Sequence, residues 1–159
     1  MITPEIMKVI RQVANKHGLS PSLVAAIVEQ ESAGEVYTQR IEPDFRYFFD
    51  PLTFSRRLRV SVETERMCQA TSWGLMQIMG AVCRERGFMK YFGEIFQPEI
   101  NLEYGCRHLK SFLDLYKTEV EAIASYNAGS PRKASDGKGF VNQHYVNTVL
   151  ELKKKFDGH

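Results

Sequence analysis

The sequence predicts one mostly α-helical domain with a small β or loop region near its middle. Apolar residues recur at helical spacing along most of the chain, and the Ser, Thr, Pro and Gly residues between these segments are typical of helix ends. The chain has 159 residues, of which 43% are hydrophobic, so it can bury one core without a metal or a disulfide. We therefore expect residues 1–159 to form a single domain.

The first helix is predicted from about residue 4 to residue 17. Thr3 precedes it as an N-cap, Pro4 suits the first helical position, and Gly18 ends it. Its apolar residues share one face, and they are Ile6, Val9, Ile10 and Val13.

A second helix is predicted after Ser20, which caps it, and Pro21, which opens it. Its apolar face is formed by residues at the i, i+3 and i+4 positions, namely Val24, Ile27 and Val28. The next position on this face, at i+7, is Glu31. Glu29 lies about 140° round the helix from Val24, so we expect it to point to solvent.

The middle of the chain is less regular. Helical spacing is absent from residue 33 to about residue 61, which favours a long loop or a small strand region. Helical spacing returns over residues 62–69, and a further helix is predicted from residue 73 through residue 82, ending near Gly87.

Three more helices are predicted in the second half of the chain. One begins at Pro98, and another begins at Thr118, which forms a capping-box pattern with Glu121, and ends at Gly129. A loop over residues 130–139 precedes the last helix. The apolar positions of that helix are Val141, Tyr145, Val146, Val149 and Leu150.

Charge and targeting signals argue against several classes of protein. The chain carries 21 Lys and Arg against 19 Asp and Glu, and this net charge of +2 is too small to indicate nucleic-acid binding. No apolar run approaches the length of a membrane span, and the first residues lack the pattern of a secretory signal peptide. We expect a protein made in the cytoplasm, with no nucleic-acid partner and no stable membrane insertion.

Cysteine and histidine spacing gives no indication of a metal site. The three cysteines form no CxxC pair, and the four histidines show no HExxH pattern. These residues are Cys68, Cys83, Cys106, His17, His108, His144 and His159. We therefore expect free thiols, no metal and no other cofactor.

Glu31 is the first candidate for chemistry. A carboxyl that continues an apolar helix face is partly desolvated, which raises its pKa toward the range useful to a general acid. The alternative is that this face reaches the surface at the last turn, where a glutamate is simply exposed. Spacing alone leaves both interpretations open.

Two further segments combine polar side chains with apolar patterns. In residues 71–79, Gly74 precedes Gln77 on the predicted helix and would let another chain or a ligand approach closely. Tyr126 follows Ile123 at helical spacing, so its buried phenol needs a hydrogen-bond partner. Periodicity alone favours ordinary core packing for the first segment, and a satisfied core tyrosine is the alternative for the second.

Four short motifs occur in a particular order along the chain. They are Glu31-Ser32, Gly74-Leu75-Met76-Gln77, Ser125-Tyr126-Asn127-Ala128-Gly129 and Tyr145-Val146, with Asn101-Leu102 and Gly105 before the third. Together they resemble the motifs of soluble lytic transglycosylases, lysozyme-like enzymes that cut peptidoglycan and are related to goose-type lysozyme. The segment from Glu42 to Tyr47 resembles one carried by compact phage endolysins and virion-associated lysins. The resemblance implies a lysozyme-like domain, with the small β or loop region between the catalytic helix and the Gly-Leu-Met-Gln turn.

The resemblance also implies a reaction and a site. Glu31 corresponds to the family's catalytic acid, which protonates the β-1,4 bond between N-acetylmuramic acid and N-acetylglucosamine. It then removes the proton of the sugar's own 6-hydroxyl, so that a 1,6-anhydro end forms. The implied substrate-binding residues are Ser32, Met76, Gln77, Tyr126, Asn127 and Tyr145. The partner is the glycan strand of the bacterial wall, met in the periplasm after release or delivery, and we expect a monomer.

One departure from the family pattern leaves a second reaction open. Glu31 and Gly74 are farther apart in the sequence than in shorter family members, and the extra segment can supply a second carboxylate. A hydrolase uses such a group as base or nucleophile. The candidates are Glu42, Asp44 and Asp50. The alternative is that each is a surface carboxylate paired with Arg40, Arg46 or Arg56.

Other interpretations stay open. A lysozyme-like module can bind glycan without cutting it, although Glu31 is present. The arginines of residues 56–59 and the lysines of residues 153–155 are compatible with an α-helical interaction or DNA-binding protein. The same lysines, at the end of the last helix, are also compatible with attachment to an anionic envelope. Trp73 either stacks on a sugar or belongs to the core.

Overall fold

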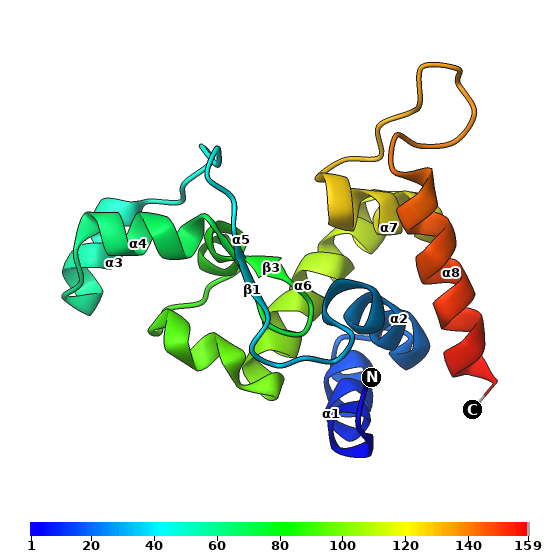
Figure 1. The fold of residues 1–159 in the computed structure, drawn as a ribbon, viewed down its shortest axis with the longest axis horizontal. Coiled ribbons are helices and arrows are strands. Elements are labelled where there is room, and N and C mark those ends of the chain that lie inside the picture. Colours follow the sequence, from blue (N-terminus) through cyan, green and yellow to red (C-terminus); the bar gives the residue numbers. More distant parts are fainter. Residues whose placement is uncertain (159) are drawn as a thin grey trace.

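The computed structural model describes residues 1–158, and His159 lies outside the described residues. These residues form eight α-helices, one 3-10 helix and a three-stranded sheet, and none of their helices has the length and apolar character of a membrane span. One half of the molecule contains α1 (Pro4–Lys16), α2 (Pro21–Ser32), α6 (Pro98–Leu115), α7 (Glu119–Ala128) and α8 (Gln143–Asp157) (Figure 1). The other contains α3 (Pro51–Leu58), α4 (Val62–Gln69), α5 (Gly80–Glu85), the 3-10 helix η1 (Phe92–Phe96) and the sheet. The predicted mostly α fold is confirmed.

Local sequence signals determine several helix ends. The Thr3 side chain accepts a hydrogen bond from the N–H of Ile6 at the start of α1. Thr118 and Glu121 form both bonds of the capping box that begins α7, and Gly129 ends that helix in the left-handed region, with φ of 79°. Helix α8 begins only at Gln143, so the expectation that Val141 packs on it is wrong. Val141 is 56% exposed.

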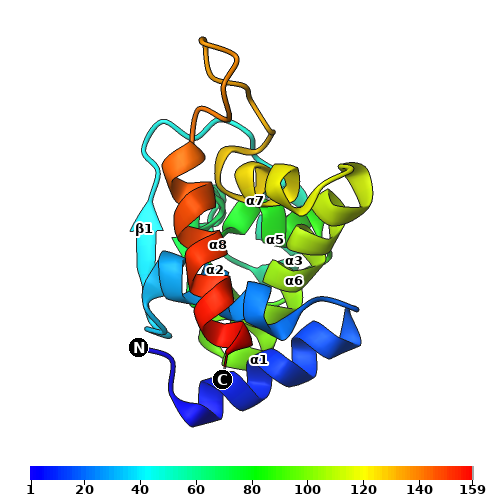
Figure 2. The same cartoon turned by 90° about the vertical axis from the view of Figure 1, so that its right-hand side faces the viewer.

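Helix α2 lies at the centre of the helical half. All residues from Leu23 to Val28 are buried, so this helix is apolar on every side rather than along one stripe. Helix α8 packs along it (Figure 2), and α1 also contacts it. Because α2 is surrounded, Glu29 is half-buried, with a buried Oε2, and the expectation that it points to solvent is wrong.

A small sheet replaces most of the helix predicted over residues 73–82. Strand β2 (Thr71–Trp73) pairs antiparallel with β1 (Gln39–Ile41) and β3 (Ile78–Met79), which places Ser72 opposite Arg40 and Met79. A helix is excluded at the β2–β3 turn because Gly74 and Gln77 both adopt positive φ values, 66° and 46°. Helix α5 therefore starts only after β3.

The expectation of loop or strand for residues 33–61 is correct except over residues 51–58, which form helix α3. Asp50 is the N-cap of α3, accepting a 3.3 Å hydrogen bond from the N–H of Thr53. Pro51 occupies the first helical position. Asp50-Pro51 is therefore the same kind of start signal as Thr3-Pro4.

The half of the molecule that contains the sheet has its own apolar core. Its buried members are Trp73, Ile78, Cys83, Phe88, Phe92 and Ile95. Trp73 stacks on Phe92, with 5.5 Å between ring centroids, and its indole N–H donates to the carbonyl of Cys68 at 2.9 Å. Trp73 is therefore a core residue.

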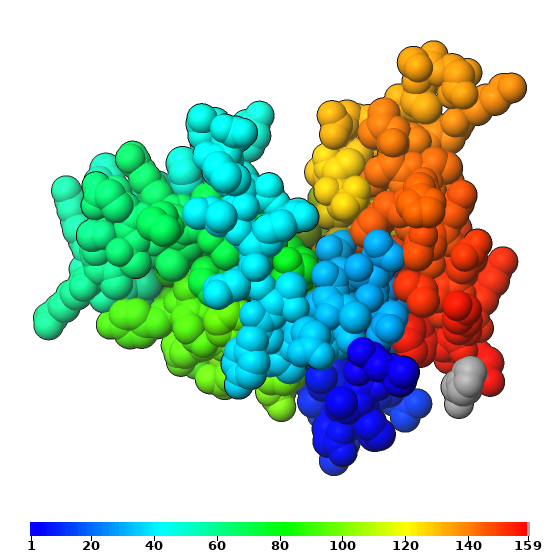
Figure 3. Space-filling model, in the orientation of Figure 1, coloured from blue at the N-terminus to red at the C-terminus, as the bar shows by residue number. Residues whose placement is uncertain are grey.

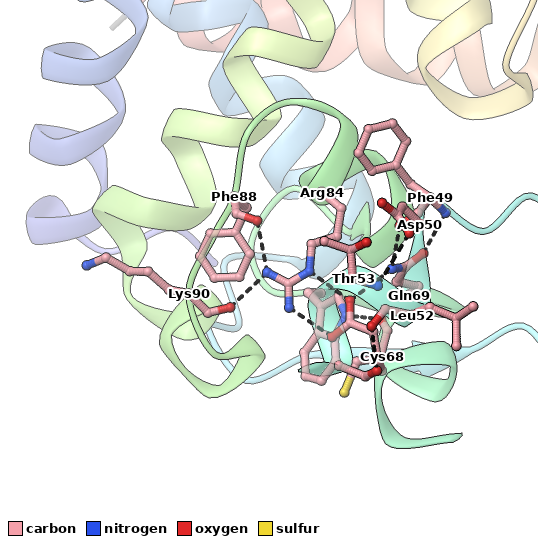
Figure 4. Close-up of polar contacts among 12 residues, drawn as sticks. Phe49, Asp50, Leu52, Thr53, Cys68, Gln69, Arg84, Phe88 and Lys90 are labelled. Carbon is pink, nitrogen blue, oxygen red and sulfur yellow. Dashed lines mark hydrogen bonds and ion pairs between the residues drawn. The ribbon is translucent and has the colours of Figure 1, made fainter. Parts of the chain in front are cut away.

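Arg84 is the polar centre of that core. Its guanidinium makes 2.8 and 3.0 Å bonds to the two carboxylate oxygens of Glu65, and it donates to the carbonyls of Phe88 and Lys90 (Figure 4). Both ionised side chains are almost completely buried. Glu65 also accepts a bond from Gln69, whose amide holds the backbone of the segment before α3. The network thus ties α4 to α5 and to the chain that enters α3.

Candidate active site

A cavity of about 260 Å³ lies between the two halves of the molecule. We call it the Glu31 cavity. The residues that line it are Glu31, Arg40, Glu42, Phe45, Ser72, Gln77, Ile78, Met79, Val82, His108, Tyr126 and Asn127. Figure 3 shows the surface hollowed between the cyan segment that follows β1 and the yellow surface of α7. A larger groove of about 470 Å³ along α1 and α6 contains none of the predicted site residues.

Glu31 reaches this cavity from the last turn of α2. Its Oε1 accepts a 2.6 Å hydrogen bond from the phenol of Tyr145. Tyr145 is not one of the lining residues, so its connection to the cavity is this bond to Glu31. Burial raises the pKa of Glu31, and the Tyr145 bond and the charge of Arg40 offset only part of that increase. The carboxyl therefore keeps its proton to a higher pH than an exposed glutamate, as a general acid requires.

Helix α7 brings two further predicted residues to the cavity. The Tyr126 phenol donates to the carbonyl of Met76 at 2.8 Å, which is the partner that a buried tyrosine needs. Burial and the nearby carboxyl of Glu31 raise the pKa of Tyr126 well above its usual value, so the phenol stays protonated. Asn127 lines the cavity and accepts a 3.0 Å bond from Asn142.

Gln77 lines the cavity from the β2–β3 turn. Its side-chain N–H₂ donates to the carbonyls of Thr38 and Gly74, each at 3.0 Å. The turn itself is held by Asn101 of α6, which accepts from the N–H of Met76 at 2.9 Å and donates to the carbonyl of Trp73 at 2.8 Å. The conformation of the turn thus depends on a buried side chain more than twenty residues away.

Two of the predicted substrate-binding side chains lie behind the cavity wall. Ser32 is buried, and its hydroxyl donates to the carbonyl of Leu75 at 2.8 Å. Met76 is completely buried and packs against Gly105, where a Cβ would clash with its side chain. The expectation that the side chains of Ser32 and Met76 contact sugar is therefore corrected: both are buried, and they support the turn that carries Gln77.

The three candidate second carboxylates lie in different surroundings. Glu42 lines the Glu31 cavity and makes a 2.7 Å ion pair with Arg40. Asp44 is fully exposed, 3.9 Å from Arg46, and Asp50 caps α3. Among the described residues of this cavity, Glu42 is thus the one carboxylate besides Glu31.

Sequence patterns gave no indication that His108 or Phe45 lines the cavity. His108 follows the Gly105 motif on α6 by three residues, but a histidine on a largely apolar helix face is usually part of the core. Within residues 1–158, no group of three or more His, Cys, Asp or Glu side chains is placed to hold a metal ion.

Comparison with known families matches residues 8–147 to the family described as the Transglycosylase SLT domain. The match runs from α1 into α8 and contains every residue that lines the Glu31 cavity. No curated protein matches the chain.

Proposed function

The chain belongs to the SLT family of transglycosylases, and on this basis we propose that Glu31 is both the acid and the base of its reaction. The family comprises lytic transglycosylases, so the protein is an enzyme that cleaves glycosidic bonds of peptidoglycan. The observation that supports the role of Glu31 most strongly is its half-buried carboxyl in the cavity, held by Tyr145 and with a raised pKa.

In the proposed mechanism, protonated Glu31 donates its proton to the glycosidic oxygen while the bond from that oxygen to C1 of N-acetylmuramic acid breaks. The Tyr145 bond to Oε1 stabilises the carboxylate that results. Positive charge develops at the sugar ring, and the 6-hydroxyl oxygen of the same sugar attacks C1. Glu31 takes up the proton of that hydroxyl, so the enzyme returns to its starting state and a 1,6-anhydro end is released.

The test is mass spectrometry of soluble fragments from purified peptidoglycan, with the wild-type protein beside Glu31→Gln. Glutamine keeps the size of the side chain and an acceptor for Tyr145 but carries no transferable proton, so we expect the rate to fall more than about a hundredfold. Glu35→Gln, at an exposed position just beyond α2, serves as the control. Retention of substantial cleavage by Glu31→Gln would contradict the assignment.

A hydrolytic muramidase is the second candidate, and the position of Glu42 in the cavity is the observation that favours it. In that reaction a second carboxylate activates water or forms a covalent intermediate, and the fragments carry reducing ends. If Glu42 acts in this way, Glu42→Gln removes the reducing-end products. Anhydro products that persist in Glu42→Gln would instead support the transglycosylase. A wild-type protein that binds glycan without releasing fragments would be a glycan-binding module.

We also propose that the enzyme works as a phage endolysin that lyses bacteria, acting as a monomer. The resemblance of residues 42–47 to phage lysins supports this role, and Glu42 and Phe45 of that segment line the cavity. Co-expression with a holin is expected to lyse a bacterial culture, while Glu31→Gln with the same holin leaves the wall intact. Persistent turbidity with the wild-type protein would contradict this role.

A further inference from the structure

His108 lies in the Glu31 cavity but takes no part in the proposed proton transfers. Its ring is held by two aromatic neighbours, Tyr126 at 5.5 Å and Phe112 at 4.6 Å between centroids. The position of the imidazole is therefore set by packing before any ligand arrives.

The contact with Arg86 favours the tautomer of His108 that carries its proton on Nε2. Nη2 of Arg86 lies 3.5 Å from Nδ1 of His108 and is anchored by a 2.9 Å bond to the hydroxyl of Ser111. A guanidinium can only donate, so Nδ1 accepts and the proton resides on Nε2. Burial, with the charge of Arg86, lowers the pKa of His108 to about 4, so the ring is neutral at neutral pH.

The Nε2–H of His108 is left available to a ligand. The hydrogen bond that the His108 ring makes within the described chain uses Nδ1, and the ring lines the cavity. Three apolar side chains line the same cavity from β3 and α5, namely Ile78, Met79 and Val82. A neutral donor beside an apolar wall suits a group with a carbonyl oxygen and a methyl group, which an N-acetyl group provides.

We infer that His108 recognises an N-acetyl group of the glycan, its Nε2–H donating to the acetyl carbonyl oxygen while the methyl packs against Ile78, Met79 and Val82. The inference rests on the proposed function, because it takes the Glu31 cavity as the glycan site. It makes His108 a specificity residue, which acts in binding rather than in proton transfer.

The test compares two neutral oligosaccharides of equal length that differ at C2. Chitotetraose carries N-acetyl groups there, and cellotetraose carries hydroxyls. Affinities are measured by NMR titration in the Glu31→Gln background, in which neither sugar is cut. His108→Phe keeps an aromatic ring beside Tyr126 and Phe112 but lacks the donor, and His108→Gln supplies a side-chain N–H of similar reach. His144→Phe makes the same change at an exposed histidine and is the control.

We expect His108→Phe to weaken chitotetraose binding about five- to tenfold, the effect of losing one hydrogen bond, and to leave cellotetraose binding unchanged. His108→Gln is expected to recover most of the loss. The imidazole ¹⁵N shifts of His108 should show a proton on Nε2 that responds to chitotetraose. Equal weakening for both sugars, or no preference of the parent for chitotetraose, would overturn the inference. Cleavage of peptidoglycan by the wild-type enzyme tests the proposed function independently.

Discussion

At the scale of single residues, the chemistry depends on the environment of the Glu31 carboxyl. Glu31 is half-buried, and burial raises its pKa more than Tyr145 and Arg40 lower it. The phenol of Tyr145 also stays protonated, since burial and then the neighbouring Glu31 raise its pKa well above its usual value. Tyr145 therefore remains a hydrogen-bond donor throughout the pH range in which Glu31 titrates.

Tyr145→Phe tests this arrangement. The hydrogen bond from Tyr145 favours the charged form of Glu31, so its loss raises the pKa of Glu31 further. The acid form then persists to higher pH, and the alkaline limb of the kcat/KM profile shifts to higher pH. We expect kcat to fall about tenfold as well, because a bond to a charged group is lost. The measurement is a pH profile of muropeptide release.

Tyr37→Phe is the control for that experiment, because Tyr37 is 77% exposed and lies outside the Glu31 cavity. An alkaline limb that stays in place or moves to lower pH in Tyr145→Phe would show that this bond does not set the pKa of Glu31.

At the scale of elements, the β2–β3 turn links three parts of the site. It carries Gln77 into the cavity, its Leu75 carbonyl binds Ser32 at the end of α2, and its Met76 carbonyl binds Tyr126 of α7. Asn101 of α6 holds the turn through two backbone groups. Asn101 is completely buried, so this part of its motif is structural rather than a direct sugar contact.

Asn101→Asp is expected to lower the free energy of unfolding by about 3 kcal/mol. Aspartate keeps the acceptor for the N–H of Met76 but cannot donate to the Trp73 carbonyl when ionised, and it buries a charge. Urea unfolding at neutral pH measures the loss. Asn147→Asp, at an exposed position on α8, is the matched control and should change stability by less than about 0.5 kcal/mol. Similar values for the two variants would contradict the role of Asn101.

At the scale of the whole molecule, the cavity depends on two halves that each have a core. The helical half packs around α2, and the other half packs around Trp73 and Arg84. The guanidinium of Arg84 lies over the rings of Phe54 and Phe92, 4.6 and 4.1 Å from their centroids, while it pairs with Glu65. This arrangement keeps α3 and α4 attached to α5, the helix that places Val82 in the cavity.

Arg84→Met is expected to cost about 3–5 kcal/mol of unfolding free energy, because Glu65 is left buried without its ionic partner. Adding Glu65→Met to the same chain should recover part of this loss, since no charge then remains buried. Urea unfolding of both variants is the measurement. Lys90→Met breaks only a partly exposed 3.7 Å pair with Glu94 and should change little. A double variant less stable than Arg84→Met would contradict this account.

The sequence by itself determined several helix ends and the family. Caps such as Thr3 and Thr118, and Gly129 at the end of α7, act within one helical turn, so they can be identified without knowing the rest of the fold. The ordered motifs likewise indicated the transglycosylase family, which the match over residues 8–147 confirms. The spacing of Glu31 along its helix is also a local property, so the sequence could identify it as a candidate, whereas its role as the acid is implied by the family resemblance.

Tertiary structure alone decided which side chains reach the cavity. Residues 71–79 form a hairpin because β2 pairs with residues 39–41 and Asn101 holds the turn, and both partners are distant in the sequence. The same long-range packing buries Ser32 and Met76, and it brings Glu42 and His108, but not Asp44, to the Glu31 cavity. Strand pairing and burial depend on residues far apart along the chain, whereas the patterns read from the sequence are local.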